Sequence, residues 1–370
     1  MNLNKLELIN FRNYDKQIIN FSTNINLFYG GNSSGKTNII EAIYYISTVK
    51  SFRCSEDIFL LKNDCDFFQI SADITYENNI NKKYCIEYNK INNKKNLKID
   101  EKKIYRFNEL IGKIPLVLFS PEHILLIKNE PQLRRRYIDN ILINTDIEYY
   151  NLYNKFIKIV YQRNSILKLI KENKLNKKNI EVLNIQLKDL SIKIIEHRKK
   201  IIDNLNKIIN LKLVEDDRKI ELKYCIKKFD KINNDNLEIY FQDFFEKYIE
   251  NEIVRCATLI GPHRDDIEIY LNDKLLKYYG SEGQQRLSCI ILKLAEGLYI
   301  KEKLNVYPIV LLDDFTSELD ETNKIFISKI FGNFKQIIIT TTSKENIKNI
   351  RVDKCFFVEN GRINDNEQDK

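Results

Sequence analysis

The chain has 370 residues, of which 43% are hydrophobic and 30% charged, and its net charge is +8. This composition is typical of a globular protein of about two domains. No secretory signal, membrane span or C-x-x-C metal motif is visible among its seven cysteines and three scattered histidines, so we expect a cytoplasmic protein with reduced thiols and no structural zinc.

The first elements lead into a glycine-rich loop. Residues 1–22 alternate apolar and polar side chains around Phe11-Arg12-Asn13-Tyr14, which predicts two strands and a turn, and residues 24–29 predict a third strand. The next stretch is Gly30-Gly31-Asn32-Ser33-Ser34-Gly35-Lys36-Thr37, which fits the phosphate-loop pattern G-x-x-x-x-G-K-[ST]. Apolar residues then recur at helical spacing from Ile39 to Ile46.

This loop is therefore expected at a helix N-terminus, where free N–H groups and the helix dipole attract anions. Gly30 and Gly35 would let the backbone curl around a phosphate chain. Lys36 would reach the β- and γ-phosphates, and the Thr37 hydroxyl would bind Mg²⁺. The alternative is a glycine-rich turn without a ligand, which does not explain why strand, loop and helix agree.

Two regions of different character follow. Residues 68–105 alternate with period two and predict an antiparallel meander, and residues 114–119 predict a buried strand. Residues 131–212 contain no Gly and no Pro after Pro131, which suits the first position of a helix. Their apolar residues recur every three or four positions, which predicts long helices that form an antiparallel pair turning near 173–179. We interpret this region as an insertion within a nucleotide-binding fold.

The inserted region also carries most of the excess positive charge. Residues 150–212 contain 15 Lys and Arg against 5 Asp and Glu, so the remainder of the chain is close to neutral. A basic segment on a near-neutral body indicates a polyanionic partner, which Lys199 and Lys200 are expected to contact. The alternative, a solvated helical arm, is equally compatible with the charge alone.

The last third returns to alternating strands and helices. We expect strands at 219–227, 267–271, 275–279, 308–312 and 336–340, helices at 236–256, 283–304 and 325–331, and a hairpin near 355–361.

Two polar stretches in this last third contain candidate metal-binding, catalytic and phosphate-binding residues. Asp313 and Asp314 end an apolar strand, where the first carboxylate could hold Mg²⁺ and the second could orient an attacking water. Upstream, Ser281-Glu282-Gly283-Gln284-Gln285 opens a helix, and its small residues could donate N–H groups and a hydroxyl to phosphate.

Together these stretches resemble the ABC ATPases. The loop with Lys36 is similar to Walker A, Ser281–Gln285 to the signature motif, Asp313-Asp314 to Walker B with the catalytic acid, and Ser317–Asp320 to the D-loop. The switch histidine of transporters is absent, Asp314 stands in place of Glu, and 245 residues separate Lys36 from Ser281. These features fit the DNA-repair branch that includes SMC and Rad50.

Within that branch the whole chain resembles the RecF family. The stretches that carry the resemblance are residues 10–14, 35–38, 50–53, 119–122, 134–139, 261–266, 283–286 and 312–314. Two positions depart from the family pattern: Gly280 stands in place of Ala, and Glu282 in place of Gln. The resemblance implies an α/β fold: an ABC-ATPase head, with a mixed sheet and an antiparallel β lobe, formed by residues 1–125 and 256–370 around an inserted helical arm at 126–255.

The resemblance also implies a function. It is that of a slow, DNA-stimulated ATP hydrolase that uses ATP and Mg²⁺ and dimerises on single-stranded, gapped or junction DNA. With RecR and RecO it would help to load RecA, supporting replication, recombinational repair and SOS induction. Lys36 and Asp314 would be catalytic, Thr37 and Asp313 would bind the metal, and Ser281, Gly283 and Gln284 would contact the γ-phosphate held by the other subunit. The alternatives are another SMC-like repair ATPase and a transporter ATP-binding subunit.

Three further stretches have two interpretations each. Arg134–Arg136 could contact DNA, but at least one of them is expected to form an internal ion pair with Asp139 or Glu130. The stretch His263–Asp266 contains residue types that are found in acid–base catalytic sites, although a hydrogen-bonded hinge is the preferred interpretation. Arg12 or Tyr14 could stack on adenine or simply pack in the core.

Overall fold

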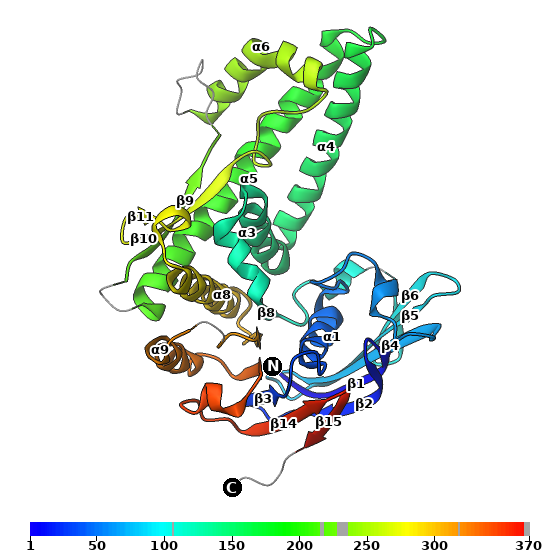
Figure 1. The fold of residues 1–370 in the computed structure, drawn as a ribbon. Helices are drawn as coiled ribbons and strands as arrows, with labels where there is room; N and C mark the ends of the chain where they lie inside the picture. Colours follow the sequence, from blue (N-terminus) through cyan, green and yellow to red (C-terminus); the bar gives the residue numbers. More distant parts are fainter. Residues whose placement is uncertain (106, 215–217, 228–235, 317–318, 366–370) are drawn as a thin grey trace. The chain divides into compact units, whose positions relative to one another are not determined.

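The computed structural model describes residues 1–105, 107–214, 218–227, 236–316 and 319–365 (Figure 1). The chain divides into two compact units. Unit 1 contains residues 1–124 and 281–370, and unit 2 contains residues 125–280. Residues from both ends of the chain thus form one unit, and a continuous inner segment forms the other.

Unit 1 contains an antiparallel six-stranded sheet in the order β2-β1-β4-β5-β6-β7. Alternate side chains are buried, as in β5, where Tyr84, Ile86 and Tyr88 face the core. The two N-terminal strands and the meander are confirmed, and β1 pairs with β4 to join them. The strands are β1 (Asn2–Phe11), β2 (Tyr14–Asn20), β4 (Phe67–Thr75), β5 (Asn81–Asn89), β6 (Lys94–Ile99) and β7 (Lys102–Ile104).

Unit 1 also contains a mixed six-stranded sheet in the order β15-β14-β3-β13-β12-β8. All neighbours in this sheet run parallel except β15, which forms the predicted hairpin with β14. Every residue of β12 and β13 is buried, which explains their apolar runs at 309–312 and 337–339. The strands are β3 (Ile25–Tyr29), β8 (Leu116–Phe119), β12 (Ile309–Asp313), β13 (Gln336–Thr341), β14 (Lys354–Glu359) and β15 (Arg362–Asp365).

The helices of unit 1 follow from the predicted apolar periodicity. Three α-helices form: α1 after the glycine-rich loop, α8 after Ser281, and α9 between β12 and β13. Short 3₁₀ turns occupy several connections. The bounds of these α-helices and 3₁₀ turns are α1 (Lys36–Thr48), α8 (Glu282–Leu304), α9 (Glu321–Phe331), η1 (Asp57–Leu60), η2 (Phe107–Leu110), η3 (Pro121–Ile124) and η6 (Lys344–Ile347).

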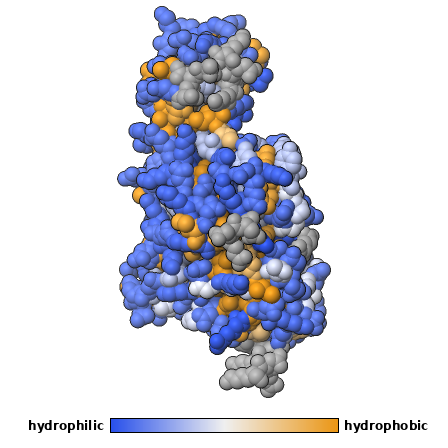
Figure 2. Space-filling view, turned by 90° about the vertical axis from the view of Figure 1, so that its left-hand side faces the viewer, coloured by the Kyte–Doolittle hydropathy of each residue, from blue (hydrophilic) through white to orange (hydrophobic). Residues whose placement is uncertain are grey.

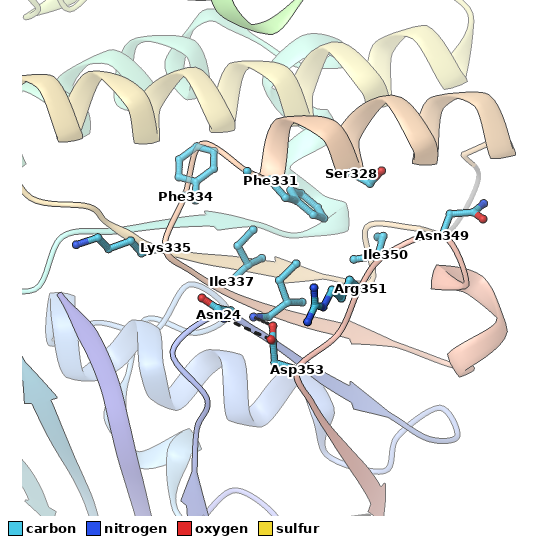
Figure 3. A pocket seen from close by; sticks show the side chains of 12 residues that line it. Asn24, Ser328, Phe331, Phe334, Lys335, Ile337, Asn349, Ile350, Arg351 and Asp353 are labelled. Carbon is cyan, nitrogen blue, oxygen red and sulfur yellow. Dashed lines mark hydrogen bonds between the residues drawn. The ribbon is translucent and has the colours of Figure 1, made fainter. Parts of the chain in front are cut away.

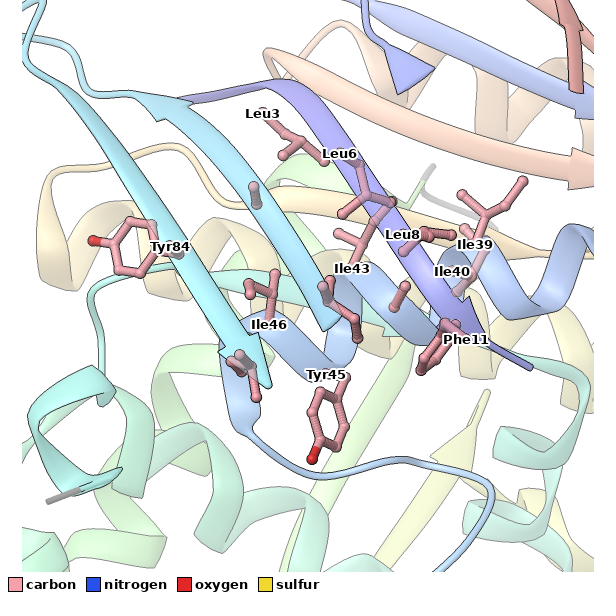
Figure 4. Close-up of a cluster of buried hydrophobic side chains, with 14 of the residues drawn as sticks. Leu3, Leu6, Leu8, Phe11, Ile39, Ile40, Ile43, Tyr45, Ile46 and Tyr84 are labelled. Atoms are coloured by element: carbon pink, nitrogen blue, oxygen red, sulfur yellow. The ribbon is translucent and has the colours of Figure 1, made fainter. Parts of the chain in front are cut away.

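Helix α1 is held by the main hydrophobic core of unit 1. Leu3, Leu6 and Leu8 of β1 face the isoleucines of α1, which are fully or almost fully buried (Figure 4). The same cluster reaches Leu311 of β12 and Ile338 of β13. Because α1 packs against both sheets, its first residues, which follow the glycine-rich loop, are fixed in position.

Unit 2 is mainly helical, and α4 and α5 form the predicted antiparallel pair, with η4 in the turn. Helix α3 begins at Pro131, as expected. The elements are α2 (Leu125–Lys128), α3 (Pro131–Thr145), α4 (Ile147–Lys171), η4 (Lys177–Ile180), α5 (Glu181–Ile208), the π-helical η5 (Ile209–Leu213), α6 (Leu237–Arg255), α7 (Leu276–Tyr279), β9 (Ile220–Cys225), β10 (Asp266–Leu271) and β11 (Lys274–Leu275).

Two predictions about the end of unit 2 were wrong. The second boundary lies at 280/281 rather than 255/256, because β10 pairs with β9 from Asp266↔Cys225 to Leu271↔Ile220. The strand expected at 275–279 is mostly the short helix α7. Only Leu276 is buried there, whereas Tyr278 and Tyr279 are exposed, so the alternation of a half-buried strand is absent.

Buried Arg–carboxylate pairs connect the elements of unit 2. Arg163 pairs with Glu252, and both side chains are inaccessible to solvent. Arg198 pairs with Asp139, donating from Nε and Nη2 at 2.8 Å each. Arg134 forms the expected internal ion pair, but its partner is Asp266, at 2.8 Å and 2.9 Å, rather than Asp139 or Glu130. The arginine triplet is thus partly structural.

Arg163→Met is expected to destabilise the protein because it leaves the Glu252 carboxylate buried without its partner. Breaking such a pair costs about 3–5 kcal/mol, measured as a loss in the free energy of unfolding in urea. Lys177→Met is the control, since the Lys177–Glu250 pair is exposed at the surface and its loss should change stability by less than about 0.5 kcal/mol. Equal effects of the two substitutions would contradict the prediction.

Among the helices of the described residues, none has the length and apolar character needed to span a membrane. In the view of Figure 2 most of the surface is hydrophilic, with hydrophobic residues in smaller areas between the polar ones.

Candidate functional site

The glycine-rich loop joins β3 to α1, as predicted. Gly30 has a φ of 153° and Gly35 a φ of 117°, both in the region that favours glycine. A Cβ atom on Gly30 would lie 2.1 Å from the Val358 carbonyl oxygen, and one on Gly35 would lie 2.7 Å from the Asn13 side chain. The loop therefore requires both glycines in order to curl beneath the first turn of α1, where backbone N–H groups lack partners within the helix.

Lys36 folds back across this loop. Its Nζ donates to the carbonyl oxygens of Gly30 (2.8 Å) and Gly31 (2.7 Å). Burial lowers the pKa of the Lys36 ammonium, while the nearby carboxylates of Asp314 and Asp313 oppose that shift. A cation is thus held over the loop in a partly desolvated position, where its attraction for a phosphate is stronger than in water.

The Thr37 hydroxyl meets the Asp313 carboxylate at the carboxyl ends of the parallel strands. Thr37 Oγ1 donates to Asp313 Oδ1 at 3.1 Å, and Thr340 Oγ1 of β13 donates to the same oxygen at 2.6 Å. Burial raises the pKa of Asp313, and the hydrogen bonds from Thr340 and Thr37 act against that rise. A hydroxyl and a carboxylate oxygen are ligands that Mg²⁺ prefers, so these two residues fit the metal position.

Asp314 follows β12 with a positive φ of 44°. Its N–H donates to Thr340 Oγ1 at 3.0 Å, and its carbonyl oxygen accepts from Nη2 of Arg286 at 3.0 Å. Since Arg286 belongs to α8, the backbone of the second carboxylate is tied to the helix that Ser281 begins.

The segment that resembles the signature motif forms the N-terminus of α8. Ser281 and Gln284 form a capping box, in which Ser281 N donates to Gln284 Oε1 (2.9 Å) and Gln284 N donates to Ser281 Oγ (3.3 Å). A Cβ on Gly283 would meet nothing within 4 Å. In the described part of the chain the side-chain hydrogen bonds of Ser281 and Gln284 stay within this box, so they do not connect these residues to the glycine-rich loop of the same chain.

Two other predicted features have different outcomes. Ser317 and Glu318 of the expected D-loop lie outside the described residues, while Asp320 caps α9 by accepting from Asn323 N at 2.7 Å. In the stretch 263–266, the Asp265 carboxylate accepts from the Tyr224 hydroxyl (2.6 Å) and from Lys227 N (3.0 Å). These bonds agree with a hydrogen-bonded connection, and the hinge role stays a prediction.

The structure adds residues that sequence reasoning did not place in the site. Asn13 Nδ2 donates to the Ser34 carbonyl (3.1 Å), Asn38 Nδ2 donates to Asn13 Oδ1 (2.8 Å), and Arg53 Nη1 donates to Asn38 Oδ1 (2.8 Å). The Arg53 charge also acts to lower the pKa of Asp313. All three residues lie in the stretches that carried the family resemblance, which was the signal that could have identified them.

Arg12 and Tyr14 pack rather than face a nucleotide base. The Arg12 guanidinium donates to both carboxylate oxygens of Glu41, which is fully buried, at 2.8 Å and 2.7 Å. The Tyr14 side chain is buried and its hydroxyl donates to the Gly35 carbonyl at 3.1 Å. Of the two interpretations, packing is therefore the one that the structure supports.

Comparison with known proteins gives the family. Residues 2–364 match the family model described as "RecF/RecN/SMC N terminal domain". The chain is 37% identical over 371 residues to "DNA replication and repair protein RecF" of Clostridium perfringens, covering 98% of this chain and 99% of the relative. It is 38% identical over 354 residues to the RecF of Acetivibrio thermocellus, covering 94% and 95%. The chain belongs to the RecF family.

Solved structures agree with this assignment. The structure described as "recombination mediator protein RecF-ATPrS in RecFOR pathway" matches with a TM-score of 0.86 and 31% identity, over 98% of each chain. The head of Smc bound to the C-winged helix domain of ScpA matches with a TM-score of 0.58 and 17% identity, covering 99% of this chain and 97% of that one, which shows the fold alone. The predicted ABC-ATPase fold class is confirmed for this RecF-family chain.

A pocket of about 430 Å³ lies elsewhere in unit 1 (Figure 3). It is lined by residues at the amino ends of β3 and β13, including Ile25 and Ile337, and by Phe331 and Arg351. The phosphate loop follows the carboxyl end of β3, so this pocket is distinct from the candidate nucleotide site.

Proposed function

We propose that this chain is an ATP-dependent DNA-binding clamp of replication and recombinational repair. The observation that carries the proposal is the meeting of Lys36, Thr37 and Asp313 at the carboxyl ends of β3 and β12 in a RecF-family chain. Solved RecF structures described with ATP and with ATPrS have the same fold over 98% of this chain. The proposal includes a cytoplasmic location, where bacterial DNA lies.

Within this proposal each site residue has one role. The loop N–H groups of residues 30–35 and the Lys36 ammonium hold the β- and γ-phosphates of ATP. Thr37 and Asp313 supply two oxygen ligands for Mg²⁺, which would neutralise phosphate charge when bound. Asp314 orients the attacking water, and Ser281, Gly283 and Gln284 complete the site of a second copy of the chain. Hydrolysis is slow, is stimulated by DNA, and resets the clamp.

The proposed partners follow from family membership. The chain would dimerise with ATP on single-stranded or gapped DNA and at duplex junctions. It would act with RecR and RecO in loading RecA, and so support SOS induction. Another SMC-like repair ATPase remains the alternative, and a transporter subunit is disfavoured because the inserted unit presents a basic helical surface.

Sedimentation velocity tests this function directly. The full chain should stay monomeric alone and shift to a dimer when both ATP and gapped DNA are present. A dimer that forms equally well without nucleotide, or no association under any of these conditions, would contradict the proposed switch.

The two adjacent carboxylates should have separable roles. Asp313→Asn should weaken binding of Mg²⁺-ATP by about tenfold, because it removes a metal ligand beside Thr37. Asp314→Asn should leave binding nearly unchanged and slow hydrolysis by about 10²-fold, which holds the dimer longer. Titration with a fluorescent nucleotide and steady-state hydrolysis measure the two effects. Equal loss of binding in both variants would refute this division of roles.

A further inference from the structure

The exposed face of α4 is basic over most of its length, with the exposed acids Glu148 and Glu172 at its two ends. From Tyr149 to Lys171 the helix contains no Asp or Glu. Lys155, Lys158 and Lys168 are exposed on it, and none of these three forms an ion pair in the part of the chain that the structure describes. Their charges are therefore available to a partner from solution.

The opposite face of α4 packs inside unit 2. Phe156 and Leu167 are almost fully buried, and Arg163 is paired with Glu252. The cationic side chains of α4 thus fall into two sets, one structural and one facing solvent. Only the solvent-facing set can contact a polyanion without unfolding the unit.

Helix α5 differs, although it belongs to the same basic segment. One row of exposed positions alternates in charge: Asp189, Lys193, Glu196, Lys200, Asp203 and Lys207 follow one another at spacings of three or four residues. The exposed Lys199 has Glu196 three residues before it and Asp203 four residues after it. Neighbours at these spacings interact and partly neutralise each other. The sequence prediction that placed the phosphate contacts at Lys199 and Lys200 is therefore replaced by one that uses α4.

An exposed aromatic residue lies within the basic face. Tyr161 is 74% exposed and lies one turn from Lys158 and from Ser165, with Ile157, 44% exposed, one turn before it. Lys155 and Lys168 are about 20 Å apart along the helix axis, from a rise of about 1.5 Å per residue. A solvent-exposed ring flanked by unpaired cations is the arrangement that binds a single strand, because an unpaired base offers its face for stacking.

We propose that the face of α4 formed by Lys155, Lys158, Tyr161 and Lys168 is a single-stranded DNA contact, in which Tyr161 stacks on an unpaired base and the lysines hold the phosphates. The inference rests on the proposed DNA-binding function and deepens it. A duplex keeps its base faces stacked inside, so Tyr161 discriminates for single strands, whereas the lysines bind either form.

Fluorescence anisotropy with the full-length protein tests the lysines. Lys155→Gln/Lys158→Gln/Lys168→Gln should flatten the slope of log affinity against log salt for oligo(dT) by about 2, since each phosphate contact on a single strand contributes roughly 0.7. The matched control Lys193→Gln/Lys200→Gln/Lys207→Gln removes three lysines from α5 and should leave the slope nearly unchanged. The reverse result would overturn the inference.

A second oligonucleotide tests the aromatic residue. Wild-type protein should bind oligo(dT) about fivefold or more tightly than an abasic strand of equal length and charge. Tyr161→Ala should abolish that preference and Tyr161→Phe should keep it, because both rings stack. If Tyr161→Ala kept the preference, stacking on α4 would be wrong. Wild-type protein that bound no DNA would overturn the proposed function itself, whereas normal DNA binding by all α4 variants would overturn only this inference.

Discussion

Lys36→Ala should reduce ATP affinity by about 100-fold or more and abolish ATP-dependent retention on DNA. The ammonium is held over the loop by the Gly30 and Gly31 carbonyls and is partly desolvated, so a phosphate there would gain charge-assisted hydrogen bonds worth ~3 kcal/mol. Lys36→Arg should lose almost as much ATP affinity and DNA retention, because a planar guanidinium cannot replace a compact ammonium in this space. Nucleotide titration and a DNA-retention assay measure both effects.

The control for this experiment is Lys50→Ala. Lys50 is exposed and follows α1, outside the loop, so its loss changes the net charge equally without touching the site. Wild-type retention by Lys36→Ala in the presence of ATP would remove the basis for an ATP switch. A similar loss in Lys50→Ala would show that overall charge, rather than the loop, is responsible.

Ser281→Arg should leave ATP binding by the monomer intact and block formation of the ATP dimer. Among the described residues, the side-chain hydrogen bond of Ser281 lies within the capping box of α8, and it does not reach the phosphate loop of its own chain. In the proposed dimer this helix start would face the γ-phosphate of the other copy, where an Arg side chain would clash. Sedimentation with ATP and gapped DNA, beside nucleotide titration of the monomer, measures the two effects.

Two controls separate the clash from lost capping. Ser281→Ala removes the cap, at a cost of about 1 kcal/mol in stability, but adds no bulk and should still dimerise. A mixture of Lys36→Ala with Ser281→Arg can form at most one complete site of two, so it should dimerise weakly where each variant alone does not. Loss of monomer ATP binding in Ser281→Arg would assign the motif to its own subunit's site.

The parts of this molecule that were predicted correctly depend on local patterns. The glycine-rich loop requires its glycines and its strand–helix context within a few residues, and the apolar run before Asp313 identifies a buried strand. Their meeting through the Thr37–Asp313 bond required two distant motifs to be recognised as one set. Fold class and the inserted unit followed from the same reasoning.

What could not be predicted depends on pairings between distant residues. Arg134 has Glu130 four residues before it and Asp139 five residues after it, yet it pairs with Asp266, because β10 brings that residue to α3. Helices α4 and α5 both belong to the basic segment and both carry net positive charge, and only the helical register with its burial separates the alternating charges on α5 from the exposed lysines of α4. For this reason, composition alone could not distinguish a solvated helical arm from a site that binds a polyanion.

The strand order of the mixed sheet also determines when the nucleotide site comes into existence during synthesis. β3 lies between β13 and β14, and β8 pairs with β12, so both early strands depend on partners from the last fifth of the chain. Residues 125–280 form their own compact unit and are synthesised on the order of ten seconds or less before the last strands that the sheet needs. We therefore expect the helical unit to fold on the ribosome first, while β3 and β8 still lack their partner strands. A nascent chain released before Thr341 has a complete arm and no place for a nucleotide.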